Sequence, residues 1–487
     1  MRRTASLFSA LPRRIAAYMF HSFTAVPANR LENPVLPVRA GSNVKDQEAA
    51  MSSYIVKQTD GDTSWFIHDR FGMFIHFGLY SCGARGEWFK SKEELSDDSY
   101  DRYFRHFDPD LFDARQWAQR AKAAGMKYAV LTAKHNDGFC LFDSRYTDYK
   151  STNTPAGRDF VKEYVKAFRE AGLKVGIYYS LIDWHHSDYQ IDVFHPLRRS
   201  PGAQAANETR SMERYREYLT CQVKELLCNY GKLDIFWFDF TYPDMRSIDN
   251  EANQFAIHDY QSWMPWTTQR TWHSSELIAM MRSLQPHLII NDRAGIAQDI
   301  STPEQTMMEQ WPKYAGSEEL SVWEACHTFS GAWGYARDEM SWKTPETLIR
   351  ILIQSVSSGG NLIMNVGPTG RGCFDERAEQ ALEVYAQWMS RNSRSIYGCT
   401  KAEPEFTPPS GTLLTQSQNG KRLYIHLVDY PYAEMHMQNL ADRIEYAQFL
   451  HDASEIQYRR TDGGAVRFLV PGIRPKQVIP VIEVFVK

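Results

Sequence analysis

Polar side chains suited to acid–base or nucleophilic chemistry follow several short apolar runs of this 487-residue chain. Asp239 ends the run Ile235–Phe238, and Arg293 closes the stretch Asn291-Asp292-Arg293 after a later run. His76 and His135 follow two earlier runs. If these runs are parallel strands of a barrel, their carboxyl ends gather at one face and bring the polar groups together. The pattern therefore indicates one site built at strand ends.

Asp239 is the leading candidate for a catalytic nucleophile. The run before it predicts a strand buried on both faces, so its carboxylate differs from an ordinary solvated one. An aspartate that caps the following loop or helix is the alternative interpretation. A glycosidase nucleophile needs this placement, because a rigid carboxylate supplied with hydrogen bonds stays ionised while partly desolvated.

Retaining glycoside hydrolysis needs a second carboxyl group about 5–5.5 Å from the first. Four acids follow the predicted fifth strand, namely Asp299, Glu304, Glu309 and Glu324. Spacing along the sequence does not choose among them, and each taken alone is typical of a solvated loop acid.

Other polar residues allow more than one interpretation. His76 and His135 are typical of satisfied structural histidines, although neutral imidazoles also bind sugar hydroxyls. Glu87-Trp88 lies on the predicted loop after the first strand and could be a surface acid beside a half-buried ring. The pair His185-His186 has no third ligand at a suitable spacing, so we expect no metal and no cofactor.

Residues 64 to about 395 alternate between apolar runs and amphipathic stretches, which predicts βαβ units and a parallel sheet. A (β/α)8-type barrel fits this span, whereas an open doubly wound sheet is weakened by the lack of a GxGxxG motif after an early strand. The predicted helices are Ala114–Ala124, Asp159–Ala171, Met212–Tyr230 and Glu376–Met389, and the first three are followed by a terminating glycine. The predicted strands are Gly72–His76, Lys127–Ala133, Lys174–Ser180, Leu233–Phe238, Leu288–Asp292 and Asn361–Val366.

The rhythm changes after Ile396 to short strands separated by turn signals, which predicts a small antiparallel β-sandwich. The predicted strands there are Leu413–Thr415, Arg422–Leu427, Tyr446–Leu450, Val466–Val470 and Val478–Val486. We expect three parts: an N-terminal extension, 1–50, rich in Arg and without stable structure; a barrel domain, 51–398; and the sandwich, 399–487.

Composition excludes some classes of partner. The net charge of −4 gives no general attraction to nucleic acid or to anionic membranes, and no apolar run is long enough to span a bilayer. Seven cysteines without CxxC spacing favour a cytoplasmic protein over a disulfide-linked secreted one. The sequon at Asn207 matters only if the chain is secreted. The oligomeric state, including a homo-oligomer, stays open.

From Trp65 to about Thr400 the chain resembles the α-L-fucosidases of glycoside hydrolase family 29. Seven stretches in the family's order carry the resemblance: Gly72–Gly78, Gly86–Phe89, Lys134–Phe139, Gly176–Ser180, Trp237–Asp239, Asn291–Arg293, and Gly359–Leu362 followed by Asn365–Pro368. The resemblance implies a retaining exo-glycosidase that removes terminal α-L-fucose from glycans or oligosaccharides on a barrel followed by a sandwich.

The resemblance also implies roles for single residues. It makes Asp239 the nucleophile and Glu304 the general acid/base. It places His76, Glu87, Trp88, His135, Tyr178, Trp237 and Arg293 around the sugar. Where many family members carry two adjacent histidines, this chain has His135-Asn136, and Asn136 has a shorter reach and does not titrate near neutrality. A related glycosidase for another sugar and a non-catalytic glycan-binding protein are the alternatives.

Overall fold

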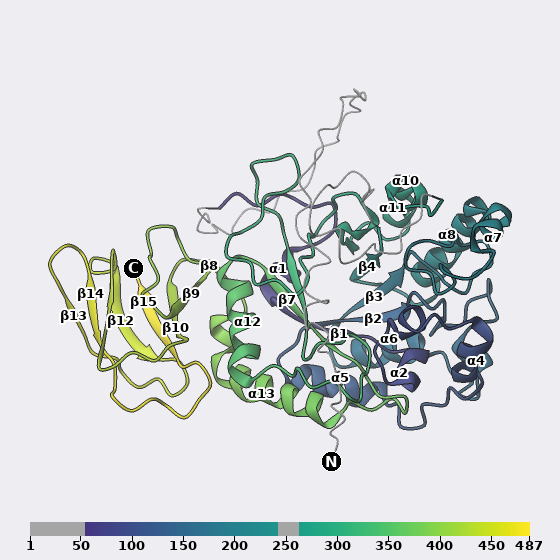
Figure 1. Ribbon diagram of the computed structural model, residues 1–487. Helices are drawn as coiled ribbons and strands as arrows, with labels where there is room; N and C mark the ends of the chain where they lie inside the picture. The colour runs from purple at the N-terminus through teal and green to yellow at the C-terminus, as the bar shows by residue number, and fades with distance from the viewer. Residues whose placement is uncertain (1–53, 242–262) are drawn as a thin grey trace, which may run out of the picture.

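The structure is a computed structural model that describes residues 54–241 and 263–487 (Figure 1). A parallel sheet ringed by helices occupies most of the molecule, and a smaller antiparallel part, yellow in Figure 1, lies at one side. The predicted extension 1–50 lies outside the described residues, and the boundaries of the domains stay a prediction.

Seven parallel strands form the large sheet in the order β5-β4-β3-β2-β1-β7-β6. Nearly all of their residues are buried, because helices cover the outer face and side chains fill the inner one. The strands are β1 (Phe71–Ile75), β2 (Tyr128–Lys134), β3 (Lys174–Ser180), β4 (Ile235–Asp239), β5 (Ile289–Ile290), β6 (Glu324–Thr328) and β7 (Asn361–Val366).

A short segment, residues 300–304, lies between the two edge strands and closes the sheet into a barrel. Ile300 forms a parallel bridge to Asn291 just beyond β5, and Glu304 forms one to Cys326 in β6. Backbone N–H groups donate across both sides, from Ile300 to Ile290 at 3.4 Å and from Cys326 to Pro303 at 3.0 Å. The segment therefore takes the position of an eighth strand, as the predicted (β/α)8-type barrel requires.

The four predicted helices, α5, α6, α8 and α13, begin within one residue of the predicted starts, because polar N-cap side chains accept from their first N–H groups. Asp113 accepts from Arg115 and Gln116, and Asp159 accepts from Lys162. The helices are α1 (Ser64–Asp69), α2 (Leu79–Gly83), α3 (Phe89–Lys92), α4 (Asp97–Arg105), α5 (Ala114–Ala123), α6 (Phe160–Glu170), α7 (Ala203–Thr209), α8 (Met212–Asn229), α10 (Gln269–Trp272), α11 (Ser274–Leu284), α12 (Pro345–Ser357) and α13 (Glu376–Asn392), with short 3-10 helices η1 (Ser151–Asn153), η3 (Asp292–Ala294) and η4 (Ser393–Ser395).

The C-terminal part consists of two antiparallel sheets, of order β12-β15-β10-β9-β8 and β11-β14-β13. A separate apolar core fills the space between them and includes Leu423, Ile425 and Phe468. The strands are β8 (Cys399–Lys401), β9 (Thr412–Ser417), β10 (Arg422–Leu427), β11 (Glu434–Met437), β12 (Ile444–Phe449), β13 (Tyr458–Arg460), β14 (Val466–Leu469) and β15 (Val481–Val486).

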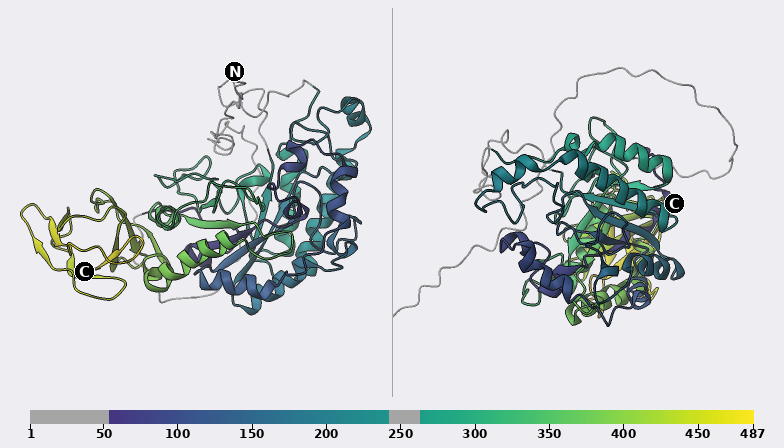
Figure 2. Two further views of the ribbon diagram at one scale, coloured as in Figure 1. Left: turned by 60° about the horizontal axis from the view of Figure 1, so that its bottom comes forward. Right: turned by 90° about the vertical axis from the view of Figure 1, so that its right-hand side faces the viewer.

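The sandwich packs against the barrel through α12 and α13, which lie between the two parts in Figure 1 and in the left view of Figure 2. The indole N–H of Trp388 in α13 donates to the carbonyl of Ile479 at 3.1 Å. Buried Arg70, just before β1, donates from Nε to the carbonyl of Cys399 at 2.8 Å. The barrel's apolar core continues into the sandwich at Ile479 and Val481.

Candidate active site

Asp239 stands at the carboxyl end of β4, directly opposite Ser180 of β3. Three donors hold its carboxylate: the hydroxyl of Tyr178 reaches Oδ2 at 3.1 Å, and the N–H of Phe240 and Nη1 of Arg293 each reach Oδ1 at 3.0 Å. The side chain is 14% exposed. Donors therefore reach both oxygens of the Asp239 carboxylate and fix its orientation.

Arg293 holds two carboxylates with one nitrogen. Its Nη1 lies 3.0 Å from Asp239 Oδ1 and 2.9 Å from Glu304 Oε2. Two oxygens that share one nitrogen at these distances lie less than about 6 Å apart. This is close to the distance between the two catalytic carboxyl groups of retaining glycosidases and below that of inverting ones. Sequence spacing could not supply this juxtaposition, because one acid ends β4 and the other ends the closing segment, far along the chain.

The orientation of Arg293 is fixed by the closing segment. Its Nε donates to Thr302 Oγ1 at 3.1 Å, and its Nη2 donates to the Thr302 carbonyl, also at 3.1 Å. Its guanidinium carbon lies 5.1 Å from the ring centre of Trp237. Burial opposes the charge, but Asp239 and Glu304 raise the pKa of Arg293 above its usual value.

Glu304 ends the closing segment and is 16% exposed. Burial raises the pKa of its carboxyl group; Arg293 acts in the opposite direction, and Asp239 raises it further. A glutamic acid with a raised pKa beside an ionised aspartate is the arrangement that lets one group donate a proton while the other attacks.

The other three acids do not join this pair. Asp299 accepts from the N–H groups of Gly61 and Ile290 and pairs with Arg282, so it is a structural residue. Glu309 is exposed.

Glu324 is fully buried at the amino end of β6, opposite Asn361, where it accepts a hydrogen bond from Tyr128. The expectation of a solvated loop acid at this position was wrong. Glu324 also lies at the end of the barrel opposite to Glu304, which removes it as a candidate for the acid/base.

His76 and His135 lie together on the inner wall, with ring centres 5.4 Å apart. Asn365 donates from Nδ2 to the carbonyl of Trp333 at 2.7 Å, and its Oδ1 can therefore only accept from His76 Nδ1, at 2.6 Å. His76 Nδ1 is therefore the donor, which leaves Nε2 as an acceptor for a ligand. Burial and His135 lower the pKa of His76, so the ring is neutral.

Aromatic rings connect the remaining predicted residues. His135 stacks on Tyr178 at 5.4 Å, and Phe240 meets His135 at 5.8 Å and Trp88 at 5.5 Å between ring centres. Trp237 packs edge-on against Phe74. These contacts place Trp88, His135, Tyr178 and Trp237 around Asp239.

Glu87 is buried and accepts from the N–H of Gly334 at 2.7 Å. It is close enough to Glu304 to raise the pKa of that carboxyl group.

Asn136 is fully buried, and neither polar atom of its side chain has a hydrogen-bond partner among the described residues. An unsatisfied buried amide costs on the order of 1–3 kcal/mol, so such groups usually await a ligand or water. Asn136 therefore offers one donor and one acceptor to a bound molecule.

The sequence patterns did not single out Phe240 or Trp333. Phe240 has φ of 75°, an unusual left-handed conformation for an aromatic residue, and Trp333 lies 5.2 Å from the ring of His76. The pairing of Gly334 with Glu87 is a contact between distant loops, which no local pattern reveals.

Within residues 54–241 and 263–487, no group of three or more His, Cys, Asp or Glu side chains is arranged to hold a metal ion. In the same ranges, no helix has the length and apolarity to cross a bilayer.

Comparison with known proteins identifies the family. Residues 41–394 match the family model described as Alpha-L-fucosidase. The chain belongs to the α-L-fucosidase family. It is accordingly a glycoside hydrolase, of the family numbered 29.

Relatives of this α-L-fucosidase family support the assignment along most of the chain. An α-L-fucosidase of Dictyostelium discoideum is 28% identical over 360 residues, covering 69% of this chain and 71% of the relative. The plasma α-L-fucosidase of Homo sapiens is 29% identical over 367 residues, covering 69% of each chain.

Two solved structures share the fold. The α-L-fucosidase isoenzyme 1 from Paenibacillus thiaminolyticus is 40% identical with a TM-score of 0.79, covering 87% of this chain and 98% of that one. The second is a family 29 α-L-fucosidase from Bacteroides thetaiotaomicron, solved as a trapped covalent intermediate with 2-fluoro-fucosyl fluoride. It is 26% identical with a TM-score of 0.73, covering 90% of this chain and 99% of that one.

Proposed function

We propose that this enzyme releases terminal α-L-fucose from glycans by double displacement, with Asp239 as nucleophile and Glu304 as general acid/base. The observation that carries the proposal is the sharing of Arg293 Nη1 by the two carboxylates, at 3.0 and 2.9 Å. A distance below about 6 Å between the two carboxyl groups leaves no room for a water between Asp239 and the sugar, so direct attack by Asp239 is favoured.

In the first step, Asp239 attacks the anomeric carbon and forms a glycosyl ester, while the bond to the leaving oxygen breaks. Glu304 gives its proton to that oxygen, which its raised pKa allows. In the second step, Glu304 takes a proton from water, the water oxygen bonds to the anomeric carbon, and the ester bond to Asp239 breaks. The sugar leaves with its original configuration, and both carboxyl groups return to their starting states.

The remaining residues would hold the sugar. The free Nε2 of His76 and the unpartnered amide of Asn136 offer hydrogen bonds to hydroxyl groups. Trp88 and Trp237 offer apolar ring faces, which suit the C–H face and methyl group of a 6-deoxy sugar. The relatives are α-L-fucosidases, and one solved structure was trapped with a fucosyl reagent, which supports fucose as the sugar.

The test is hydrolysis of nitrophenyl α-L-fucoside, with proton NMR of the first anomer released. Retention of the α-configuration is expected, and early formation of the β-anomer would contradict double displacement. Asp239→Asn should lose activity by at least about 10⁴-fold while keeping the fold. Glu304→Ala should act slowly on natural glycans but recover activity toward the aryl substrate when azide is added.

A second candidate is a retaining glycosidase for a different sugar, and Asn136 is the observation that favours it. A shorter, non-titrating amide in place of a second histidine changes which hydroxyl groups can be bonded. A panel of aryl glycosides decides between the two: faster turnover of any other glycoside than of the α-L-fucoside would replace the first proposal.

We also propose a cytoplasmic location. All seven cysteines lie in the described ranges as free thiols, which supports a reducing compartment. Asn207, the acceptor of the one sequon noted, bonds the backbone of Ile191 through both amide atoms, at 2.6 and 3.0 Å. A glycan on Nδ2 would break one of these bonds. Detection of the native chain in a secreted fraction with a glycan on Asn207 would refute this location.

A further inference from the structure

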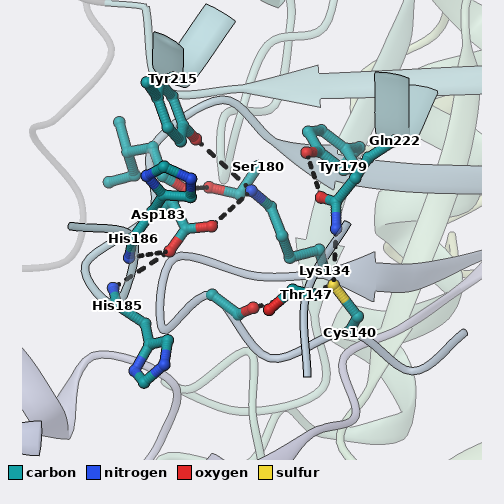
Figure 3. Close-up of polar contacts among 12 residues, drawn as sticks. Lys134, Cys140, Thr147, Tyr179, Ser180, Asp183, His185, His186, Tyr215 and Gln222 are labelled. Carbon is teal, nitrogen blue, oxygen red and sulfur yellow. Dashed lines mark hydrogen bonds and ion pairs between the residues drawn. The ribbon is translucent and has the colours of Figure 1, made fainter. Parts of the chain in front are cut away.

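A buried ion pair lies behind the proposed sugar pocket and has no role in the chemistry above. Lys134 is the last residue of β2, and Asp183 lies on the loop after β3. Lys134 Nζ reaches Asp183 Oδ2 at 2.9 Å, and the two side chains are 0% and 1% exposed (Figure 3). Lys134 directly precedes His135 and Asn136 in the sequence. Its side chain therefore belongs to the first residue before the loop that carries these two sugar-binding candidates.

Both charges are satisfied by their surroundings. The ammonium lies 4.4 Å from the ring centre of Tyr179 and 5.4 Å from that of Tyr218. The second carboxylate oxygen of Asp183 accepts the N–H groups of His185 and His186, at 3.0 and 2.9 Å (Figure 3). Burial acts against the charge of Asp183, but Lys134 lowers its pKa overall, so the carboxyl group is ionised.

The loop that carries Asp183 is bonded to the proposed site on two sides. The N–H of Trp184 donates to the carbonyl of Asn136 at 2.8 Å, and the N–H of Leu181 donates to the carbonyl of Asp239 at 3.2 Å. The loop of residues 181–184 is therefore hydrogen-bonded both to the backbone of Asn136 and to the backbone of Asp239. The ion pair fixes this loop to β2.

Gly138 shows how closely the two loops approach. It has φ of 81°, and a Cβ atom there would lie 2.2 Å from Asp183 Oδ1. The turn after Asn136 consequently packs directly on the Asp183 carboxylate, with no space for a side chain.

Stability alone does not explain such a pair, because replacing both charges of a buried ion pair by neutral groups of similar size often leaves stability unchanged. We propose that Lys134 and Asp183 are positioning residues, which hold the His135–Asn136 loop in register with Asp239 so that a sugar can meet the nucleophile. The inference rests on the proposed function for its substrate and on the loop contacts for its geometry.

The test replaces both charges at once, with Lys134→Met and Asp183→Asn combined, since either single change leaves one buried charge unpaired. We expect the thermal midpoint to stay within about 5 °C of the parent. We expect kcat/KM for nitrophenyl α-L-fucoside to fall about 10–100-fold, mainly through a higher KM. The pH limbs should not move, because Asp239 and Glu304 keep Arg293. A folded double variant with an unchanged KM would overturn the inference.

The control is an ion pair at the junction with the sandwich, away from the pocket, between exposed Arg394 in η4 and fully buried Glu483 in β15. Arg394→Met with Glu483→Gln tests the loss of an ion pair away from the site. Its KM should equal that of the parent, whatever its thermal midpoint. An equal rise of KM in this control would show that the first effect is not local.

Hydrogen exchange provides a second reading that needs no substrate. In the Lys134→Met, Asp183→Asn variant, the amides of 135–138 and 181–186 should exchange at least about tenfold faster, with the rest of the barrel unchanged. Unchanged exchange in both loops would overturn the inference. If the parent lacks fucosidase activity, the proposed function fails, and exchange still decides whether the pair orders the loops.

Two glycine substitutions distinguish the effect of the Gly138–Asp183 contact from the effect of backbone strain alone. Gly138 and Gly202 have φ of 81° and 84°, but nothing lies within 4 Å of a Cβ at Gly202. Gly138→Ala should raise KM, since the methyl group displaces Asp183, whereas Gly202→Ala should change only stability. Equal effects of the two on KM would contradict the close packing on which the inference depends.

Discussion

The two proposed catalytic acids share one nitrogen of Arg293, so the charge of each depends on the charge of the other. Burial and the charge of Asp239 raise the pKa of Glu304, and the Arg293 guanidinium acts in the opposite direction. Arg293 therefore limits how far the pKa of the proposed acid/base rises.

Replacing Arg293 by Lys should test this dependence. A lysine keeps the charge but cannot bond both carboxylates and Thr302 together, because it lacks the planar fork. We expect kcat/KM to fall by about 100-fold or more. The basic limb of its pH profile should move to higher pH, because Arg293 opposes the raised pKa of Glu304 and a lysine bonds it less well. An unchanged basic limb, measured with the aryl fucoside, would show that Arg293 does not control the ionisation of Glu304.

Phe240 stores backbone strain directly after the nucleophile. A side chain at φ of 75° costs on the order of 1 kcal/mol relative to glycine, and the ring contacts with Trp88 and His135 offset it.

Phe240→Ala should therefore be less stable than Phe240→Gly by about 1 kcal/mol in urea unfolding, since only the glycine relieves the strain. Leu413, in the extended strand β9, supplies the control, where Ala should be more stable than Gly. If Ala also proves the more stable replacement at position 240, the left-handed conformation stores no strain.

At the scale of elements, the closing segment 300–304 brings the acid/base to the nucleophile. It bridges Asn291 on one side and Cys326 on the other, so Glu304 enters the barrel wall beside Arg293. Thr302 gives its hydroxyl to Asp292 at 2.7 Å and accepts from Arg293, which couples the segment to the end of β5.

Thr302→Val keeps the shape of the segment and removes this coupling. We expect about a tenfold lower kcat/KM and a loss of about 1 kcal/mol in the free energy of unfolding, because Arg293 loses one of its two bonds to Thr302. Thr461→Val, in a turn of the sandwich, is the control and should leave kcat/KM unchanged. A fully active Thr302 variant would mean that the Thr302 hydroxyl is not needed to position Arg293.

The sequence predicted those elements whose pattern is local. The ranges of β3, β7 and β10 agree residue for residue, and α5, α6 and α8 end at the glycines expected to stop them. Strand β6 was missed because Glu324, His327 and Thr328 interrupt its apolar pattern, although all are buried. In the sandwich, β8, β11 and β13 were missed because strands of three or four residues carry little periodicity.

The same distinction holds for the site. A strand that ends in Asp239 is a local signal, and it placed the proposed nucleophile correctly at the carboxyl end of the barrel. The choice of Glu304 over Asp299, Glu309 and Glu324 depends on the closing segment, whose bridges join residues far apart in the sequence. Phe240 and Trp333 depend on a backbone angle and on a contact between loops, which composition and spacing do not encode.

At the scale of the whole molecule, one buried acid links pH to stability. Burial raises the pKa of Glu324 to about 8, and the hydrogen bond from Tyr128 acts in the opposite direction. Between the unfolded value of 4.5 and about 8, the folded chain holds one proton more than the unfolded chain. The free energy of unfolding should therefore fall as the pH rises through this window, by about 1.4 kcal/mol per unit for this group.

Glu324→Gln should remove that contribution, because the amide does not titrate. Urea unfolding at pH 7 and pH 8 should show a smaller loss of stability in the variant than in the parent, by about 1 kcal/mol. The measurements at pH 7 and pH 8 lie above the unfolded pKa of histidine, 6.5, so buried histidines such as His76, whose pKa is lowered, contribute little to the difference. Identical slopes in parent and variant would mean that Glu324 is already ionised in the folded chain.

The continuous packing from the barrel through α13 to Ile479 and Val481 connects the sandwich to the catalytic part. Strand ends can hold a sugar only if the barrel that carries them is rigid, and the sandwich covers two of its helices. The site therefore depends on the fold as a whole, although its chemistry depends on two carboxyl groups.

The most direct test of the account is to find which atom the sugar bonds during turnover. The native enzyme is treated with 2-fluoro-fucosyl fluoride, whose fluorine slows release of the intermediate, and is then digested and analysed by mass spectrometry. The account predicts a single glycosyl ester on the peptide that carries Asp239, and no such adduct in Asp239→Asn. A glycosyl group on any other residue, or continued hydrolysis without an adduct, would contradict it.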